Sequence, residues 1–502
     1  MKGGLPGNTW IISVLVLGLF AGVAGASPEV VLSTYLGGSG SDHPAGDLYI
    51  DDEGFIYITG PTTSADFPVT PGAFDTTFND RSGNSDAFVM KLDPHGRILW
   101  STYLGTAERD VFYTIKADRE GYVYLAGAFG AGAPTTAGVV QPRFAGKDRD
   151  NPHAQGDGYL AKMKPDGSGL VWATYLGTKA SESIRSMDMD TDGNLVVVTS
   201  YDGEDWPAEW FRGGYQEHPQ GGVDTVILKV SSDGRRVLWG SYLGGSRDES
   251  RAPNVCLDTA DRVHVLTSTH SGDMPTTPGA HDRSFNGDSD IYVATLSPDG
   301  REMLMGTYLG TAEGEGGGGK RAVRVAPDGD LVISGWTQSS RFPTTPGAYR
   351  SEAPGYTPWG AAGVTARLSP AGKLLAATYF GSSEGLSLDS RGNVYIAFPV
   401  WKDFIPAATG AFQSKRSGGS DGALVVLSGD LQRLRYATYL GGKKDDSAKM
   451  TAIGADDGIY VTGQTRSTDF PVVHATQARN AGDMDVFLVK FSPLDSAPPG
   501  GQ

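Results

Sequence analysis

A short closing sequence, Thr/Ser-Tyr-Leu/Phe-Gly, occurs seven times along the 502 residues of this chain, each time at the end of a strand-like segment. The tyrosines of these closures are Tyr35, Tyr103, Tyr175, Tyr242, Tyr308, Tyr379 and Tyr439, separated by 60 to 72 residues. A nearly constant period indicates one supersecondary unit that is repeated, with loops of variable length absorbing the differences. This repeat constrains the architecture more than any other feature of the sequence.

Residues 42–104 show what one unit contains. Two short β-branched or aromatic runs flank an Asp-x-x-Gly turn, and after a long connection two further runs flank a second turn. Glycine allows positive φ, which closes a tight hairpin of this kind. The unit therefore predicts four antiparallel strands, at about 46–51, 55–60, 86–92 and 98–104.

Four antiparallel strands per unit, joined by short and long links in alternation, are typical of a propeller blade. The chain begins with a lone fourth strand (30–36) and ends after a third strand (485–491), so each end holds what the other lacks. Pairing the two ends would remove two exposed sheet edges. It favours a channel lined by the first strands, and a channel lined by the third strands is the alternative.

We therefore predict an all-β fold, a single seven-bladed β-propeller of four-stranded antiparallel blades spanning 27–494, whose last blade is closed by the N-terminal strand. The predicted repeats are at about 37–104, 105–176, 177–243, 244–309, 310–380, 381–440 and 441–493.

The repeated motifs are Tyr-Leu-Gly-Gly, the Asp-x-x-Gly turn, Asp-Phe-Pro-x-Thr-Pro-Gly-Ala-Phe and Asp-Ala-Phe-Val-x-Lys-Leu. They closely resemble the bacterial seven-bladed β-propeller (SBBP) repeat family, over about residues 30–493. Repeats two, three and six lose the Thr-Pro-Gly-Ala segment, and repeat five lacks the aspartate that begins the third strand. The resemblance implies an exported repeat domain and supplies no defining active site.

The first 26 residues have the features of a secretory signal peptide. A single cation, Lys2, precedes an apolar run over 10–20, and small residues end at Ala26. Because this run is shorter than the roughly 20 residues that span a bilayer, we expect cleavage after Ala26 and no membrane span afterwards; an uncleaved anchor is the alternative. The predicted location is secreted, periplasmic or at the cell surface, and residues 495–502 are predicted to be a disordered tail.

Composition excludes several classes of function. The formal charge of −16 repels phosphate backbones, so nucleic acid is not an expected partner. Cys256 is the only cysteine and forms no internal disulfide. The sequence has no paired zinc-ligand spacing, no Gly-x-Ser-x-Gly elbow and no phosphate-binding loop, so it identifies no catalytic residue and predicts no cofactor.

Strand direction predicts that both tight turns lie at one end of each blade and that both long links lie at the other, which we call the long-loop face. Binding residues gather on loops held by a rigid scaffold. An acid follows each closing motif on this face, and a ring of these acids at the propeller mouth would favour cationic ligands. In the alternative, each carboxylate caps backbone N–H groups of a loop. The acids are Asp42, Asp110, Glu182, Asp248, Glu313, Glu384 and Asp445.

The third repeat departs most from the pattern, because an aromatic loop replaces its Phe-Pro-x-Thr-Pro segment. Trp206, Trp210 and Tyr215 lie in this loop, and Trp359 lies in a similar place in repeat five. Such rings would suit stacking on a sugar or anchoring a protein partner. The alternative is a small satellite core under the loop.

One segment resembles half of a calcium-binding loop, with Asp188, Asp190 and Asp192 at alternate positions. The positions of the later ligands hold Val196 and Thr199, so the motif is incomplete. Calcium is a possible ligand, and an ordinary hairpin turn is the alternative.

These observations favour an exported, non-enzymatic binding or scaffold protein, monomeric, whose long-loop face meets a protein, glycan or cell-surface partner. One alternative is a hydrolase or lyase that acts on polysaccharide through carboxylates at the mouth. A purely structural module of the envelope is another.

Overall fold

The computed structural model describes residues 27–44, 46–79, 83–146, 156–201, 203, 206–250, 252–354, 361–380, 385–403, 405–406 and 408–495. The predicted signal peptide and residues 496–502 of the predicted tail lie outside these ranges.

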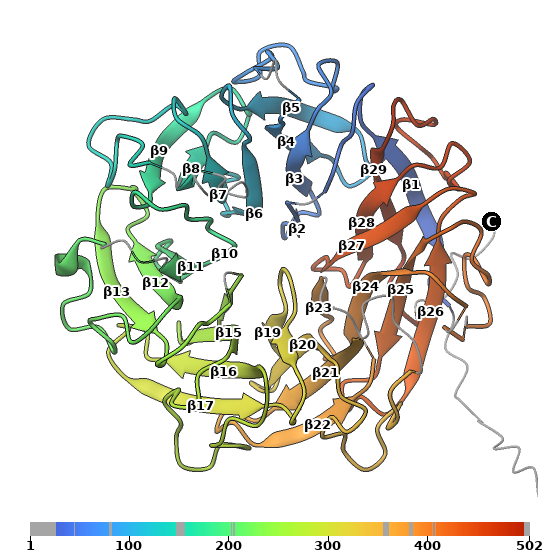
Figure 1. Cartoon of the computed structure of the whole chain (residues 1–502). Helices are drawn as coiled ribbons and strands as arrows, with labels where there is room; N and C mark the ends of the chain where they lie inside the picture. The colour runs from blue at the N-terminus through green and yellow to red at the C-terminus, as the bar shows by residue number, and fades with distance from the viewer. Residues whose placement is uncertain are drawn as a thin grey trace, which may run out of the picture.

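Seven antiparallel sheets stand in a ring, as Figure 1 shows. Six of them are built from consecutive strands, four in each blade, except that the first strand of the fifth blade is divided into two pieces. The first strands, nearest the axis, are β2 (Asp47–Ile50), β6 (Val111–Ala117), β10 (Ser186–Met189), β14 (Asn254–Leu257), β18 (Glu315–Gly317) with β19 (Val323–Val325), β23 (Leu386–Leu388) and β27 (Asp446–Ile453). The second strands are β3 (Ile56–Thr62), β7 (Val123–Phe129), β11 (Leu195–Tyr201), β15 (Val263–Thr269), β20 (Leu331–Thr337), β24 (Val394–Val400) and β28 (Ile459–Thr465).

The third strands are β4 (Asp86–Leu92), β8 (Asp157–Met163), β12 (Asp224–Val230), β16 (Asp290–Leu296), β21 (Ala362–Leu368), β25 (Asp421–Leu427) and β29 (Asp485–Phe491). The outermost strands are β5 (Ile98–Leu104), β9 (Leu170–Leu176), β13 (Val237–Leu243), β17 (Met303–Leu309), β22 (Leu374–Thr378), β26 (Leu434–Leu440) and β1 (Val30–Leu36). We number the blades from the one that begins with β2.

The seventh blade joins the two ends of the chain. Its strand order is β1-β29-β28-β27, and β1 runs antiparallel to β29 with Tyr35 opposite Phe487. The N-terminal strand thus takes the outer place that β5 holds in the first blade. The predicted all-β, seven-bladed ring and its closure are confirmed.

The core lies between neighbouring blades, because each sheet buries both of its faces. One cluster joins Val89 and Leu104 of the first blade to Phe112 and Tyr159 of the second. Burial of apolar surface between sheets is the main stabilising contribution to such an array.

In six blades, as far as the described residues show, the hydroxyl group of the closing tyrosine fixes the start of a long connection. In the first blade, Tyr103 donates to the carbonyl oxygen of Ser64 (2.7 Å) and accepts from the N–H of Phe67 (3.0 Å). Tyr308 makes the same two bonds to Ser271 and Met274 in the fourth blade. Because buried hydroxyls and backbone groups need partners, tyrosine is required at this position where phenylalanine would leave two groups unpaired.

Strand direction predicted that the connections between second and third strands lie on the long-loop face. In the structure these connections leave that face. In the first blade the connection pairs with the outer strand β5, with Thr70 N–H donating to Ser101 and Tyr103 N–H donating to Asp75. Its tip then reaches the tight turn of the next blade, where Phe74 N–H donates to the carbonyl oxygen of Gly167 (2.8 Å). The physical reason is that an unpaired outer edge exposes N–H and C=O groups, which the connection satisfies.

This clamp between blades recurs. The equivalent bonds from N–H to carbonyl oxygen are Val140 to Gly234, Tyr215 to Gly300, His281 to Gly372 and Tyr349 to Leu431.

The described residues contain one short 3₁₀ helix, η1 (Ala208–Trp210), in the aromatic loop of the third blade. None of the helices in the described ranges has the length and apolar character needed to cross a membrane.

Candidate functional site

The acids predicted for the first three blades are fully buried at the roots of the long-loop face. Asp42 accepts a hydrogen bond from the N–H of Gly38 (2.7 Å), and Asp110 accepts one from Thr106 (2.5 Å). Glu182 accepts a hydrogen bond from the N–H of Thr178 (3.0 Å). In each case the donor lies four residues before the acid, so the carboxylate closes the loop that follows the tyrosine motif.

In three later blades the acid with this role is a neighbour of the predicted one. Glu249, Glu315 and Asp446 accept from the N–H groups of Gly245, Thr311 and Gly442, respectively. The acids predicted there, Asp248, Glu313 and Asp445, lie one or two residues earlier and are exposed. Glu384 lies outside the described residues.

Each buried loop acid also faces the first residue of a third strand across a blade junction. A Cβ atom at Gly37 would lie 2.7 Å from Asp42 Oδ2 and 2.9 Å from Asp485 Oδ1, so both carboxyl groups border one point. The glycine of the closing motif leaves room for them. The six such pairs are Asp485 with Asp42, Asp86 with Asp110, Asp157 with Glu182, Asp224 with Glu249, Asp290 with Glu315, and Asp421 with Asp446.

These pairs favour the protonated acid. Burial raises the pKa of Asp110 to about 7, and burial with the nearby Glu182 charge raises the pKa of Asp157 to about 8. Oδ1 of Asp290 and Oδ1 of Asp485 are buried and have no hydrogen-bond partner among the described residues. A proton on one carboxyl group would let it donate to the other, so the pairs are suited to joining blades.

The aromatic loop of the third blade forms a local core. Trp206 is only 3% exposed and packs with Phe211 against β11 and β12, and its ring centroid lies 6.0 Å from that of Trp210. Tyr215 is partly buried between the third and fourth blades. Because the Trp206 ring is covered, it presents no open face for stacking. Trp359 lies outside the described residues.

The three acids of the calcium-like segment point to different partners. Asp188 pairs with Lys116 of the second blade (2.8 Å), and Asp190 pairs with Lys229 (2.7 Å) while accepting N–H bonds that close its own turn. Asp192 is exposed. No group of three or more potential metal ligands comes together within the described residues.

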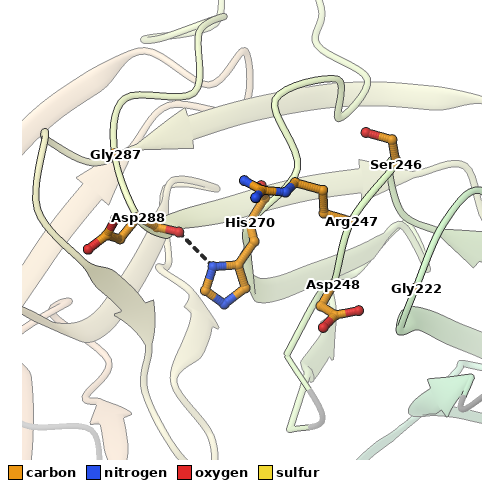
Figure 2. A pocket seen from close by; sticks show the side chains of 7 residues that line it. All are labelled: Gly222, Ser246, Arg247, Asp248, His270, Gly287 and Asp288. Carbon is orange, nitrogen blue, oxygen red and sulfur yellow. Dashed lines mark hydrogen bonds between the residues drawn. The ribbon is translucent and has the colours of Figure 1, made fainter.

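A polar cleft of about 660 Å³ lies on the long-loop face, between the third and fourth blades. Figure 2 shows its lining: Gly222, Ser246, Arg247, Asp248, His270, Gly287 and Asp288. Three loops converge here, namely the link that enters the fourth blade and the second-to-third connections of both blades. Of the acids predicted as ligand-binding, Asp248 is the one that lines this cleft.

The backbone of the cleft is fixed by its own hydrogen bonds. Asp248 Oδ1 accepts the N–H of Val223 (2.9 Å), and its carbonyl oxygen accepts the N–H of His270 (2.9 Å). His270 Nδ1 lies 2.6 Å from the carbonyl oxygen of Asp288. A carbonyl oxygen only accepts, so Nδ1 carries the proton and, in the neutral ring, Nε2 holds the lone pair.

Sequence reasoning missed Arg247, His270 and Asp288. Arg247 and Asp248 are adjacent in the chain. His270 and Asp288 lie about 20 and 40 residues later, and only the folding of the fourth blade brings them beside Arg247 and Asp248. A histidine directly after the second strand, where the first blade has Thr63, was the available signal.

Residues 33–68 match the SBBP family, described as a beta-propeller repeat. The chain is a seven-bladed β-propeller with an SBBP repeat at residues 33–68. The matched segment runs from β1 through β3 to the Phe67-Pro68 pair. No curated protein sequence matches the chain.

Several solved structures have a similar arrangement. A polysaccharide lyase described as PL25-Ulvanlyase is 12% identical over 94% of this chain and 97% of its own chain, with a TM-score of 0.47. Kuenenia stuttgartiensis hydrazine synthase is 10% identical over 88% and 97%, with a TM-score of 0.43. Quinohemoprotein alcohol dehydrogenase ADHIIG from Pseudomonas putida HK5 is 10% identical over 95% and 78%, with a TM-score of 0.40. With TM-scores below 0.5, these similarities carry no argument about ligand or reaction.

Proposed function

We propose that this chain is an exported, non-enzymatic propeller that binds a protein, glycan or cell-surface partner through its long-loop face. The observation that carries the proposal is the 660 Å³ polar cleft between the third and fourth blades. Its volume falls within the range of about 300–1,000 Å³ that is typical of small-ligand sites.

The lining of the cleft favours a polar ligand. Arg247 supplies a cation and several N–H donors, whereas Asp248 and Asp288 supply acceptors. A sugar unit or a polar peptide segment offers hydroxyl or amide groups that match both kinds of partner. An apolar ligand would leave these groups unpaired, which costs free energy.

Hydrogen bonds hold the backbone of the cleft in place, and such preorganisation lowers the entropic cost of binding. The Arg247 N–H donates to Ser271 Oγ (2.9 Å), and the bonds of Asp248 tie the same loop to the third and fourth blades. The blades themselves are joined by their shared core.

A glycan array on the purified protein tests this function, with Arg247→Ala as the variant that changes the cleft. The matched control is Lys444→Ala, because the Lys444 N–H donates to Ser467 Oγ (2.9 Å) in the seventh blade as the Arg247 N–H donates to Ser271 Oγ. We expect the parent and K444A to bind the same ligands and R247A to bind at least tenfold more weakly. Absence of any ligand for the parent, or unchanged binding by R247A, would overturn the proposal.

A second candidate is a hydrolase or lyase acting on polysaccharide. One observation favours it, because His270 has Nδ1 bonded to Asp288 and therefore presents Nε2 as a base beside Arg247. Incubation of the protein with each bound polysaccharide decides between the candidates. If the parent protein forms new reducing ends or unsaturated products and the His270→Ala variant does not, the enzymatic function is favoured over the binding function.

A further inference from the structure

The second strand ends on the same short sequence, Thr-x-Ser, in the first, fourth, fifth and seventh blades, and the middle residue differs each time. In each copy the N–H of the serine donates to the hydroxyl oxygen of the threonine, at 2.9–3.0 Å. A turn of this kind fixes its backbone through its own side chain. The four segments are 62–64, 269–271, 337–339 and 465–467.

The buried loop acid of the same blade holds this turn in place. The hydroxyl group of Thr269 donates to Glu249 (2.8 Å), and that of Thr337 donates to Glu315 (2.6 Å). Each threonine hydroxyl therefore donates once and accepts once, so the frame is fully hydrogen-bonded. The equivalent pairs in the first and seventh blades are Thr62 with Asp42 and Thr465 with Asp446.

The backbone of the middle residue is fixed as well, while its side chain differs from blade to blade. Its N–H donates to a carbonyl oxygen of the link that enters the blade, at 2.9–3.0 Å in all four copies. Thr63, His270 and Gln338 are exposed, and Arg466 is half-buried. Because the frame uses only the backbone of this residue, a hydroxyl, an imidazole, an amide and a guanidinium group occupy equivalent places on the long-loop face.

The sixth blade lacks the frame and has a tryptophan at this place. Trp401 directly follows β24 and is 40% exposed. Figure 1 shows the second strands β15, β20, β24, β28 and β3 in this order around the ring, so five consecutive blades each present a side chain there. In the second blade the place holds a buried glycine, Gly130. We call the five residues the strand-end arc; in ring order they are His270, Gln338, Trp401, Arg466 and Thr63.

The arc begins at the polar cleft, because His270 lines that cleft between the third and fourth blades. Neighbouring blades of the arc share buried cores, which keep the five positions in a fixed arrangement. A partner that enters the cleft and extends over the fifth and sixth blades would therefore meet Gln338 and then Trp401.

The chemistry of the arc favours a glycan over a protein. Protein interfaces bury a central group of apolar or aromatic anchors, whereas Trp401 is the single large apolar side chain of the arc. The other members offer hydrogen-bond donors and acceptors, and the side-chain amide of Gln338 has no hydrogen-bond partner among the described residues. A sugar chain repeats hydroxyl groups from unit to unit and offers an apolar ring face to an indole.

Building on the function proposed for the cleft, we propose that the strand-end arc binds a glycan chain of several sugar units, with one end in the cleft at His270 and a sugar ring stacked on Trp401. The side chains of the arc then determine which glycan is accepted. Affinity grows with the length of the chain, because each added unit meets a further side chain.

Isothermal titration calorimetry with the purified protein tests the arc, with the di- and hexasaccharides of cellulose, chitin and xylan as probes. We expect at least one hexasaccharide to bind at least tenfold more tightly than its own disaccharide. In Trp401→Ala that hexasaccharide should bind at least tenfold more weakly. The matched control is Leu238→Ala, because Leu238 is an apolar side chain of similar exposure (41%) at the tight-turn end of the third blade. L238A should bind like the parent.

Gln338→Ala is the second variant, because no hydrogen bond within the described part of the chain depends on the side-chain amide of Gln338. Weaker binding by Q338A is therefore not a consequence of misfolding, and we expect at least a threefold loss of affinity for the same hexasaccharide.

Equal affinities within every pair of di- and hexasaccharides would overturn the arc, as would a hexasaccharide bound equally by W401A, Q338A and the parent. If R247A nevertheless weakens binding of that oligosaccharide, the function proposed for the cleft stands without the arc. If none of these probes binds, the arc is overturned, whereas the glycan array with R247A still decides the function of the cleft.

Discussion

The hydroxyl group of Tyr35 donates a hydrogen bond of 2.9 Å to the carbonyl oxygen of Ser467, which lies 432 residues later in the chain. The same hydroxyl accepts the N–H of Phe470 (2.9 Å). Tyr103 makes the equivalent bonds to Ser64 and Phe67 within one continuous blade. The junction between the two ends of the chain is therefore built from the same contacts as an ordinary blade.

Replacing Tyr35 with phenylalanine is expected to destabilise the fold by about 1–3 kcal/mol, because the Ser467 carbonyl and Phe470 N–H lose a buried partner. Tyr103→Phe is the matched control and should cost a similar amount. Urea unfolding followed by tryptophan fluorescence measures both. A Tyr35→Phe variant as stable as the parent would contradict the closed ring.

Gly167→Ala is expected to destabilise more than Gly72→Ala. Both glycines have positive φ, of 70° and 82°, where alanine costs roughly 1–2 kcal/mol. A Cβ at Gly167 would also lie 2.5 Å from the Trp100 ring, whereas none of the described atoms lies within 4 Å of one at Gly72. Overpacking adds about 1–3 kcal/mol. Thermal unfolding midpoints compare the two variants. Equal shifts in the midpoint would show that the Trp100 ring does not pack closely against Gly167.

Stability is expected to fall as the pH rises from about 5 to 8. The pKa of Asp157 is about 8, that of Asp290 about 7 and that of Asp485 about 6, each raised chiefly by burial, against roughly 3.9 in the unfolded chain. The folded state thus binds more protons in this window, and its extra stability is lost as each acid ionises. Unfolding midpoints between pH 5 and 9 check the sign, and a midpoint that rises would contradict it.

Asp157→Asn is expected to flatten part of that dependence. The asparagine side chain keeps an acceptor for the N–H of Ala145 and offers a donor to Glu182, without a proton to lose. Asp166→Asn, on an exposed tight turn, should leave the slope unchanged. The fifth blade already holds Ala362 at the equivalent position, so the fold tolerates loss of the charge. A slope in D157N equal to that of the parent would exclude this pair as a source.

Most of the fold could be predicted from the sequence, because the repeated motifs mark where each strand and each turn lies. Tyr-Leu-Gly marks each outer strand, the turn glycines mark the hairpins, and the isolated copy at Tyr35 identifies how the ring closes. These signals can be recognised in the sequence because a backbone position with positive φ favours glycine and a buried hydroxyl at the closing position requires tyrosine.

The site was harder to predict because it depends on which way a side chain points. Glu249 and Asp248 are adjacent acids, and only the register of the loop decides which reaches the N–H of Gly245 and which enters the cleft. Burial of Trp206 likewise depends on how its loop folds over β11 and β12.

Closure by β1 has a consequence for the order in which the protein can fold. Each of the other six blades is made from one continuous stretch, whereas the strand synthesised first must wait for the strand synthesised last. Until β29 has emerged, β1 has no partner in its own sheet, and its N–H and C=O groups are open to another chain. Early termination anywhere before Asp485 would therefore leave two unsatisfied edges, and aggregation during biosynthesis is the vulnerability that this architecture carries.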